Sequence, residues 1–429
     1  MSGLRGNCAI AGVATFGIGE TPGFDAMEAQ AIAAAMALED AGIDKSRVDG
    51  LFGAMQSEFL NTLAFSEYFG IAPTFSSNNR IGGSSFLAHV QEAMAAIEAG
   101  LCSVALVTYG SVQRSLMGKL QTAVSAAWTR HETDYGPRFP VSSYALMARR
   151  HMHEFGTTRE HLAHVAVSAR KWAQLNPEAF ARGPLSVGDV VTARSVSSPF
   201  GTLDCCLVTD GAGAIVMTTA ERAKNLRTKP VAVKGYGEAH THWAIAEMPD
   251  LARLLPAQKA GETAMKMARD LKRPPVYVLG AGVAHRAKHV LGMESLTTTT
   301  AVESAARACA MARVDVADIQ MLQVYDAFTI NTILLLEDLG FVEKGAGGPF
   351  VAEGRIAPGG ELPVNTNGGG LSCCHPGMYG LFTLIEGVRQ LRGEAGERQV
   401  PGLDVALCHG VGGAFSSNAT CILGTEATL

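Results

Sequence analysis

Short apolar runs alternate along the chain with longer stretches in which apolar residues recur every three or four positions. The runs CAIAGVATF (8–16), VDGLFGAM (48–55), SVALVTYG (103–110) and GAIVMTT (213–219) are rich in Ala, Val, Ile and Leu. Runs of this length and composition predict buried strands, and the periodic stretches 24–42 and 85–100 predict helices. The alternation is typical of an α/β protein.

The same order of elements occurs twice. Residues 25–55 and 301–328 both run from an Ala-rich helix through Ile-Asp or Val-Asp and a polar turn into a hydrophobic strand. The helix and strand that end at residue 110 are echoed by a helix near 380–393 and the strand-like run 404–410. We therefore predict a duplicated unit.

The duplication divides the chain into an N-terminal half, residues 1–225, and a C-terminal half, residues 226–429. Within the first half, residues 111–200 have a different character, with many Arg, His, Trp and Tyr residues. This segment predicts a lid of helices and loops, which is a suitable place to hold a large substrate.

Composition and charge exclude several classes of protein. The 429 residues are 47% hydrophobic and 17% charged, which indicates a folded globular chain rather than a disordered one. The net charge is −5, and Lys and Arg are scattered, so we expect neither nucleic-acid binding nor a basic membrane-binding surface. No apolar stretch approaches the roughly 18 residues of a membrane span.

The nine cysteines suggest a reducing compartment. The number is odd, and the N-terminal sequence makes a poor signal peptide and a reasonable first strand, so we expect a cytoplasmic protein. The pairs Cys205–Cys206 and Cys373–Cys374 are adjacent in sequence, which does not suit a tetrahedral zinc site, and we expect no metal.

Four stretches carry candidate chemistry: NNRIGGSSF (78–86), VYDAFT (324–329), NTNGGGLSCCHPGMYG (365–380) and LCHGVGGAFSSNAT (407–420). Three of them place glycines beside a titratable side chain. Glycine allows close approach of the backbone to a ligand, and exposed N–H groups can stabilise an oxyanion. Taken one at a time, these residues also have structural explanations. His375 could simply belong to a turn, and Tyr325 and Cys408 could simply pack in the core. Their occurrence at matching ends of a duplicated unit favours a site.

These residues resemble the thiolase superfamily, and in particular its sterol-carrier and lipid-transfer-protein branch. NTNGGGLSCCHP resembles the thiolase pattern Asn-x-Asn-Gly-Gly followed by His-Pro, LCHGVGG resembles Cys-x-Gly-x-Gly, and YDAF stands in the place of Asn-Glu-Ala-Phe or His-Asp-Cys-Phe. Residues 150–177 and 202–217 also resemble this branch, and the likeness runs from about residue 7 to 425.

The resemblance implies a five-layered αβαβα fold, a homodimer and acyl-CoA substrates, with coenzyme A as part of the substrate and no covalently bound cofactor. Members of this branch commonly work with a small partner protein that carries an OB-fold and a zinc ribbon. A hetero-oligomer is therefore a further expectation.

The resemblance also reveals a departure at the nucleophile. Thiolases carry a Cys at the start of the second helix, and GSSFLAHV places Gly83 there, followed by Ser84. Glycine cannot form an acyl-enzyme. A group of steroid side-chain aldolases in the same branch also lacks this Cys and has a Tyr where Tyr325 stands, although it has a second Tyr in place of His375.

We therefore expect retro-aldol or aldol chemistry on a β-hydroxyacyl-CoA. Tyr325 and His375 would transfer protons, and Cys408 would assist at the α-carbon. An oxyanion hole would come from backbone N–H groups of Gly83, Gly410, Gly412 and Gly413.

Two alternatives remain open. One is thiolytic or Claisen acyl transfer through another residue, for which Cys408 is a better candidate than Ser84. The other is a non-catalytic acyl-CoA or lipid-binding subunit of a larger complex.

Overall fold

The computed structural model describes residues 8–118, 134–226, 231–240, 250–254, 280–281, 296–300, 314–425 and 427. The strands are β1 (Cys8–Gly19), β2 (Gly50–Gly53), β3 (Phe75–Ser77), β4 (Val104–Ser111), β5 (Ser195–Ser197), β6 (Phe200–Gly201), β7 (Asp210–Thr219), β8 (Val231–His240), β9 (Asp250–Leu254), β10 (Gly280–Ala281), β11 (Leu296–Thr300), β12 (Met321–Val324), β13 (Val405–Gly412) and β14 (Ser417–Gly424). The helices are α1 (Ala26–Ala41), α2 (Asn61–Phe69), α3 (Ser85–Glu98), α4 (Gln113–Met117), α7 (Val141–Phe155), α8 (Arg159–Gln174), α9 (Val187–Val191), α10 (Ala220–Ala223), α13 (Thr329–Asp338), α14 (Gly347–Ala352) and α15 (Gly380–Arg392). The strands and helices predicted for the first half are present as β1, β2, β4 and β7 and as α1 and α3.

Most of the strands form one ten-stranded sheet in the order β12-β13-β14-β8-β1-β7-β4-β2-β3, with β10 attached to β8. In its first half, β2 runs parallel to β4, β4 antiparallel to β7, and β7 antiparallel to β1. In its second half, β12 runs parallel to β13, β13 antiparallel to β14, and β14 antiparallel to β8. The repeated pairing pattern agrees with the predicted duplication. The helix expected over 301–313 lies outside the described residues.

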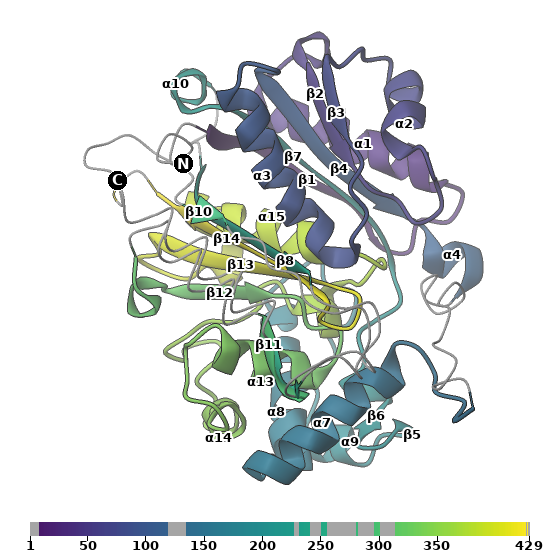
Figure 1. Cartoon of the computed structure of the whole chain (residues 1–429), viewed down its shortest axis with the longest axis vertical. Coiled ribbons are helices and arrows are strands. Elements are labelled where there is room, and N and C mark those ends of the chain that lie inside the picture. The colour runs from purple at the N-terminus through teal and green to yellow at the C-terminus, as the bar shows by residue number, and fades with distance from the viewer. Residues whose placement is uncertain are drawn as a thin grey trace.

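Helices α3 and α15 lie between the two half-sheets, as Figure 1 shows. Each contacts strands of both halves, and the two helices contact each other. On the first half-sheet, Ala105 and Val107 pack in the cluster that includes α3, whereas Val104 and Leu106 pack in the cluster that includes the alanines of α1. Alternate residues of one strand thus face two helical layers, as the predicted layered fold requires.

Local sequence explains how α1 and α3 begin. Asp25 and Glu28 form a capping box at the start of α1, and Gly42 ends the helix with φ +67°. By contrast, α3 follows directly from the 3-10 turn Gly82–Ser84 and has no side-chain cap. The start of α3 is therefore formed by small residues that let other segments approach closely.

The described part of the predicted lid, residues 111–200, is largely helical and contains α4, α7, α8 and α9. A buried contact fastens it to the second half. His151 of α7 places Nε2 2.9 Å from a carboxylate oxygen of Glu337 in α13, and its Nδ1 lies 2.7 Å from Thr157 Oγ1. The described part of the predicted lid is thus held to the C-terminal half by the His151–Glu337 hydrogen bond as well as by packing of α7 and α8 against α13.

Candidate functional site

Tyr325 and His375 form a hydrogen-bonded pair in the interior. Tyr325 follows β12 directly, and its backbone N–H donates to the His409 carbonyl at 3.1 Å. Its Oη lies 2.8 Å from His375 Nε2 and 3.3 Å from the Gly377 carbonyl. Tyr325 is 6% exposed and His375 4% exposed. The two motifs that the sequence singled out therefore meet at one point.

The loop that carries His375 is held by residues of the first half. The His375 N–H donates to Thr209 Oγ1 at 2.9 Å, and its carbonyl accepts from Gln113 Nε2 at 2.9 Å. Tyr109 Oη donates to the next carbonyl, that of Pro376, at 2.5 Å. These contacts fix the backbone on both sides of the imidazole.

The imidazole of His375 has one nitrogen available. Nδ1 is buried and has no hydrogen-bond partner among the described residues. A buried polar atom without a partner is costly, so Nδ1 can bond to a polar group of a substrate or to a water molecule. Burial lowers the pKa of His375 to about 4, and the ring is therefore neutral near pH 7.

Tyr325 keeps its proton under the same conditions. Burial raises the pKa of its phenol well above the ordinary value. The pair is consequently a neutral imidazole beside a neutral phenol. Such a pair can accept a proton from a substrate hydroxyl and return one elsewhere without either partner starting charged.

Gly83 lies against the ring of Tyr325. A Cβ added at position 83 would lie 2.0 Å from Tyr325 Cε2 and 2.6 Å from the Val411 carbonyl oxygen. No real side chain tolerates such distances, so only glycine fits while Tyr325 occupies this position. The aromatic ring fills the volume that a side chain at position 83 would need.

The glycines at the end of β13 bring its backbone onto the turn that contains Gly83. A Cβ at Gly410 would lie 3.0 Å from the Gly83 carbonyl oxygen, and one at Gly412 would lie 1.7 Å from the Ile81 carbonyl oxygen. Gly410 and Gly412 pair with β14, whereas Gly413 follows the strand with φ +63°. Gly83 and Gly413 are thus the predicted oxyanion residues that lie outside the strand ladder.

The structure places Cys408 against helix α15. Its thiol donates to the Thr383 carbonyl at 3.3 Å and is completely buried. Burial raises its pKa well above the ordinary value, so the thiol is protonated near pH 7. Ser84, the other alternative nucleophile, is also buried, and its hydroxyl lies 2.6 Å from Ser417 Oγ.

Asp326 supports the site and was not singled out by the sequence. Its carboxylate accepts from the N–H groups of Gly370 at 2.6 Å and Leu371 at 3.4 Å, within the π-helical turn Gly369–Cys373 that precedes His375. Burial raises its pKa to about 7. Its place directly after Tyr325, in the motif YDAF, was the available signal.

Asn331 is a second supporting residue that sequence reasoning missed. Its Nδ2 donates to the Tyr325 carbonyl at 3.3 Å, while its Oδ1 is buried and has no partner among the described residues. The available signal was an amide in the first turn of the helix TINTILLLED, just before its apolar run ILLL, because a buried amide normally has a specific partner.

Within the described ranges, no three His, Cys, Asp or Glu side chains are grouped so that they could hold a metal ion. None of the described helices is long and apolar enough to cross a membrane.

Comparison with known proteins supports one family. Residues 282–425 match the family described as "Thiolase C-terminal domain-like". An acetyl-CoA acetyltransferase of Methanothermobacter thermautotrophicus is 31% identical over 394 residues, covering 90% of this chain and 91% of that protein. The 17-hydroxy-3-oxo-4-pregnene-20-carboxyl-CoA lyase of Mycobacterium tuberculosis is 31% identical over 400 residues, covering 91% and 92%. The solved "Ltp2-ChsH2(DUF35) aldolase" superposes with a TM-score of 0.77 at 26% identity and covers 99% of both chains.

Proposed function

Because the chain belongs to the thiolase superfamily, and because Tyr325 fills the volume of a side chain at position 83, we propose that it is a carbon–carbon lyase for CoA thioesters. It cleaves a β-hydroxyacyl-CoA by a retro-aldol reaction, or forms one in the reverse direction. The observation that carries this proposal is the Tyr325 ring, which excludes a nucleophile at residue 83 and adds a proton-transfer group hydrogen-bonded to His375.

The reaction needs proton transfer and an oxyanion site, but no acyl-enzyme. One member of the Tyr325–His375 pair takes the proton of the β-hydroxyl. The electrons of that O–H bond form the new carbonyl, and the electrons of the Cα–Cβ bond move into the thioester as an enolate. The other member returns a proton to Cα, so the two products are a ketone or aldehyde and a shortened acyl-CoA. Neither free CoA nor an oxidant is consumed.

The enolate oxygen carries the developing negative charge. We assign its stabilisation to backbone N–H groups of Gly83 and the Gly410–Gly413 run, at about 3 kcal/mol per donor. Gly83 and Gly413 are the stronger candidates because they lie outside the β13–β14 ladder. Cys408 remains a candidate for assistance at the α-carbon, through a protonated thiol.

The names of two relatives support this substrate class. The lyase of Mycobacterium tuberculosis is named for a 17-hydroxy-20-carboxyl-CoA thioester, in which the hydroxyl is β to the thioester carbonyl. The solved structural neighbour is named an aldolase. We infer that this chain likewise acts on a β-hydroxyacyl-CoA.

The same comparisons support an assembly. We infer a homodimer, as the resemblance to thiolases implies, and a small partner protein with an OB-fold and a zinc ribbon, since the structural neighbour is named as a pair of components. We place the protein in the cytoplasm, and we divide the chain into functional halves at residues 1–225 and 226–429.

Acyl transfer is the second candidate, because an acetyl-CoA acetyltransferase is also 31% identical to this chain. It requires a nucleophile other than residue 83. The buried, protonated thiol of Cys408 argues against that role. An acyl-enzyme would appear as a mass increase after incubation with an acyl-CoA and denaturation.

The deciding experiment supplies a β-hydroxyacyl-CoA and measures the free carbonyl product with no CoA added. We expect carbonyl release by the wild type and a loss of about 100-fold in kcat for Tyr325→Phe, which keeps the ring but removes the hydroxyl. Tyr236→Phe is the matched control, because it removes a buried hydroxyl that bonds to Glu238 instead. Product that forms only with added CoA, together with an acylated protein, contradicts the proposal.

A further inference from the structure

A tyrosine of the lid reaches the loop that follows β13. Tyr144 lies near the start of α7 (Val141–Phe155) and is 2% exposed. Burial raises the pKa of its phenol far above the ordinary value, so the hydroxyl keeps its proton near pH 7. The hydroxyl donates to the Gly413 carbonyl at 3.0 Å. Two segments that are 269 residues apart in the chain are thereby joined at Gly413.

Gly413 is the accessible point of this loop. From residue 405 to residue 424 every residue is buried except Gly413, which is partly exposed. Gly82, in the turn before α3, is also partly exposed, and a Cβ added to it would lie 3.2 Å from the Gly413 nitrogen. A ligand can therefore reach the backbone of Gly413 beside the turn that contains Gly83, whereas the rest of the loop is closed to it.

The backbone of the loop has an unusual conformation. Gly413 has φ +63°, and Phe415 has φ +60°, which residues with a side chain seldom adopt. Such a conformation persists only where neighbouring groups fix it. Phe415 is completely buried, and its ring centroid lies 5.3 Å from that of Tyr144. The Tyr144 ring also lies 4.6 Å from Phe328, the last residue of the motif that begins with Tyr325. Tyr144 thus packs between the loop and this motif.

Side chains hold three carbonyls of the loop. Ser416 Oγ donates to the Gly412 carbonyl at 3.4 Å, and Asn418 Nδ2 donates to the Phe415 carbonyl at 2.8 Å. Both of these donors belong to the loop or to β14. Tyr144 differs because it comes from the lid, so its bond fixes the loop relative to another part of the molecule. A peptide unit is planar, and fixing its carbonyl therefore fixes the orientation of the whole unit.

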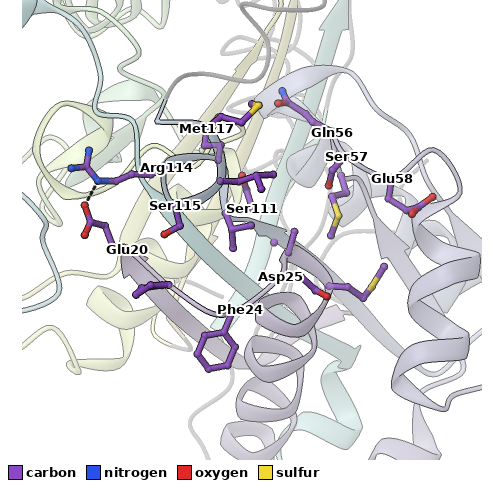
Figure 2. Close-up of a pocket in the computed structure, with 18 of the residues that line it drawn as sticks. Glu20, Phe24, Asp25, Gln56, Ser57, Glu58, Ser111, Arg114, Ser115 and Met117 are labelled. Carbon is purple, nitrogen blue, oxygen red and sulfur yellow. Dashed lines mark hydrogen bonds and ion pairs between the residues drawn. The ribbon is translucent and has the colours of Figure 1, made fainter.

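The lid holds the loop of His375 at a separate point. Gln113 of α4 donates to the His375 carbonyl at 2.9 Å. Helix α4 borders a cavity of about 770 Å³, where Arg114 is ion-paired with Glu20, as Figure 2 shows. Tyr144 lies outside the described lining of this cavity. A change at Tyr144 therefore leaves the anchor of the His375 loop in place, and its effect can be assigned to the loop after β13.

We propose that Tyr144 is a positioning residue that sets the backbone of Gly413 for the enolate oxygen of the substrate. The phenol acts through the loop, because its hydroxyl is bonded to the Gly413 carbonyl. The assignment rests on the proposed function, which gives Gly413 its part in stabilising the enolate. The lid thereby contributes to stabilisation of the transition state as well as to substrate binding.

Turnover of Tyr144→Phe tests this role, because the variant keeps the ring and loses the hydroxyl. With a β-hydroxyacyl-CoA we expect kcat to fall about tenfold and KM to stay within twofold, since the lost contact acts on the transition state. Ser143→Ala is the matched control, because this neighbouring hydroxyl is 1% exposed and has no hydrogen-bond partner among the described residues. Urea unfolding verifies that both variants are folded in the assay. Unchanged kcat in Tyr144→Phe, a change in KM alone, or an equal loss in the control overturns the proposal.

Exchange of the α-protons of acetyl-CoA in D2O separates this role from the lyase reaction. Removal of an α-proton gives a thioester enolate, and a deuteron from the solvent returns to the same carbon, so no carbon–carbon bond is broken. We expect the exchange, measured by NMR, to be about tenfold slower in Tyr144→Phe than in the wild type and unchanged in Ser143→Ala.

The outcomes of the two measurements are distinct. Exchange by the wild type without carbonyl release contradicts the proposed function, while slower exchange in Tyr144→Phe still supports the role of Tyr144. Carbonyl release by the wild type with equal exchange in Tyr144→Phe supports the proposed function and overturns the role of Tyr144. A wild type that neither exchanges nor cleaves contradicts both.

Discussion

At the scale of single residues, the ring of Tyr325 and the absent side chain of Gly83 compete for the same volume. We expect Gly83→Ala to destabilise the fold by about 1–3 kcal/mol, because the added Cβ would lie 2.0 Å from Tyr325 and 2.6 Å from the Val411 carbonyl oxygen. Urea unfolding measures the change. Gly183→Ala is the matched control, because its Cβ would meet nothing within 4 Å. Equal stability of the two variants would show that the ring moves aside freely.

The low pKa of His375 predicts how activity depends on pH. Burial lowers this pKa to about 4, and the proposed proton transfer needs the neutral ring. We therefore expect the His375 contribution to kcat/KM to stay constant from about pH 8 to 5 and to be lost as pH falls through about 4. An ordinary exposed histidine would instead lose activity near pH 6.5. An acid limb near 6.5 in the measured profile would contradict a buried, neutral His375.

Asp326 is the group to control for in this profile. Burial raises the pKa of Asp326 to about 7. A Cβ placed on Gly370 would lie 3.1 Å from the Asp326 carboxyl and 3.4 Å from His375 Cδ2. A change of activity near pH 7 that disappears in Asp326→Asn belongs to this carboxyl. A limb that persists in the variant belongs to another group.

Sequence motifs located the residues of the site better than they described its contacts. The motifs at 324–329 and 365–380 pointed to Tyr325 and His375, whose side chains lie 2.8 Å apart, although their catalytic roles remain predictions. Motifs cannot reveal that Tyr325 occupies the volume beside Gly83, because that contact joins segments far apart in the chain. Sequence alone also left Asp326 without a role, since a buried carboxylate is recognised by the N–H groups around it.

At the scale of elements, the π-helical turn Gly369–Cys373 depends on Asp326. We expect Asp326→Ala to lower the free energy of unfolding by about 1–3 kcal/mol, because the buried N–H of Gly370 would lose its acceptor. We also expect a lower kcat, because this turn leads into the loop of His375. Asp326→Asn is the matched control and keeps one acceptor oxygen. Urea unfolding and turnover of both variants measure the two effects, and equal stability of Ala and Asn would contradict this role.

The carboxyl of Asp326 also makes the stability of the fold depend on pH. Its pKa is about 7 in the folded protein and near 3.8 in an unfolded chain. Its contribution to stability is therefore full below about pH 4 and is lost as pH rises through about 7. The Asn variant has no such proton to lose, so we expect it to gain stability relative to the wild type between pH 4 and 7.

At the same scale, the regular elements were the most predictable part of the molecule. Alternating apolar and periodic stretches predicted β1, β2, β4 and β7 with α1 and α3, and all are present. The repeat predicted that β12 and β13 would match β2 and β4, and both pairs are parallel. The junction of the half-sheets through two residue pairs between β1 and β8 was not predictable, because it depends on tertiary packing and not on local pattern.

At the scale of the whole molecule, the duplication explains where the candidate site lies. Gly83 stands at the start of α3, while Tyr325 and His375 come from the second half. The lid and the first half hold the His375 loop through Thr209 and Gln113. Each half alone lacks part of this arrangement, so the proposed catalysis would require both. The boundary predicted near residue 225 remains a prediction.

The edge of the sheet leads to a prediction about assembly. Strand β3 ends the ten-stranded sheet, and in the segment that leads into it Phe59, Leu63 and Tyr68 are 81%, 62% and 55% exposed. An edge strand flanked by apolar side chains favours association with a second copy. We expect light scattering to give twice the 44.9 kDa of one chain, and Leu63→Glu with Tyr68→Glu to give monomers. Leu146→Glu, at a 54% exposed position on α7, is the matched control and should remain dimeric. A monomeric wild type at micromolar concentration contradicts the homodimer, and because the chain is measured alone, that result leaves the proposed small partner untouched.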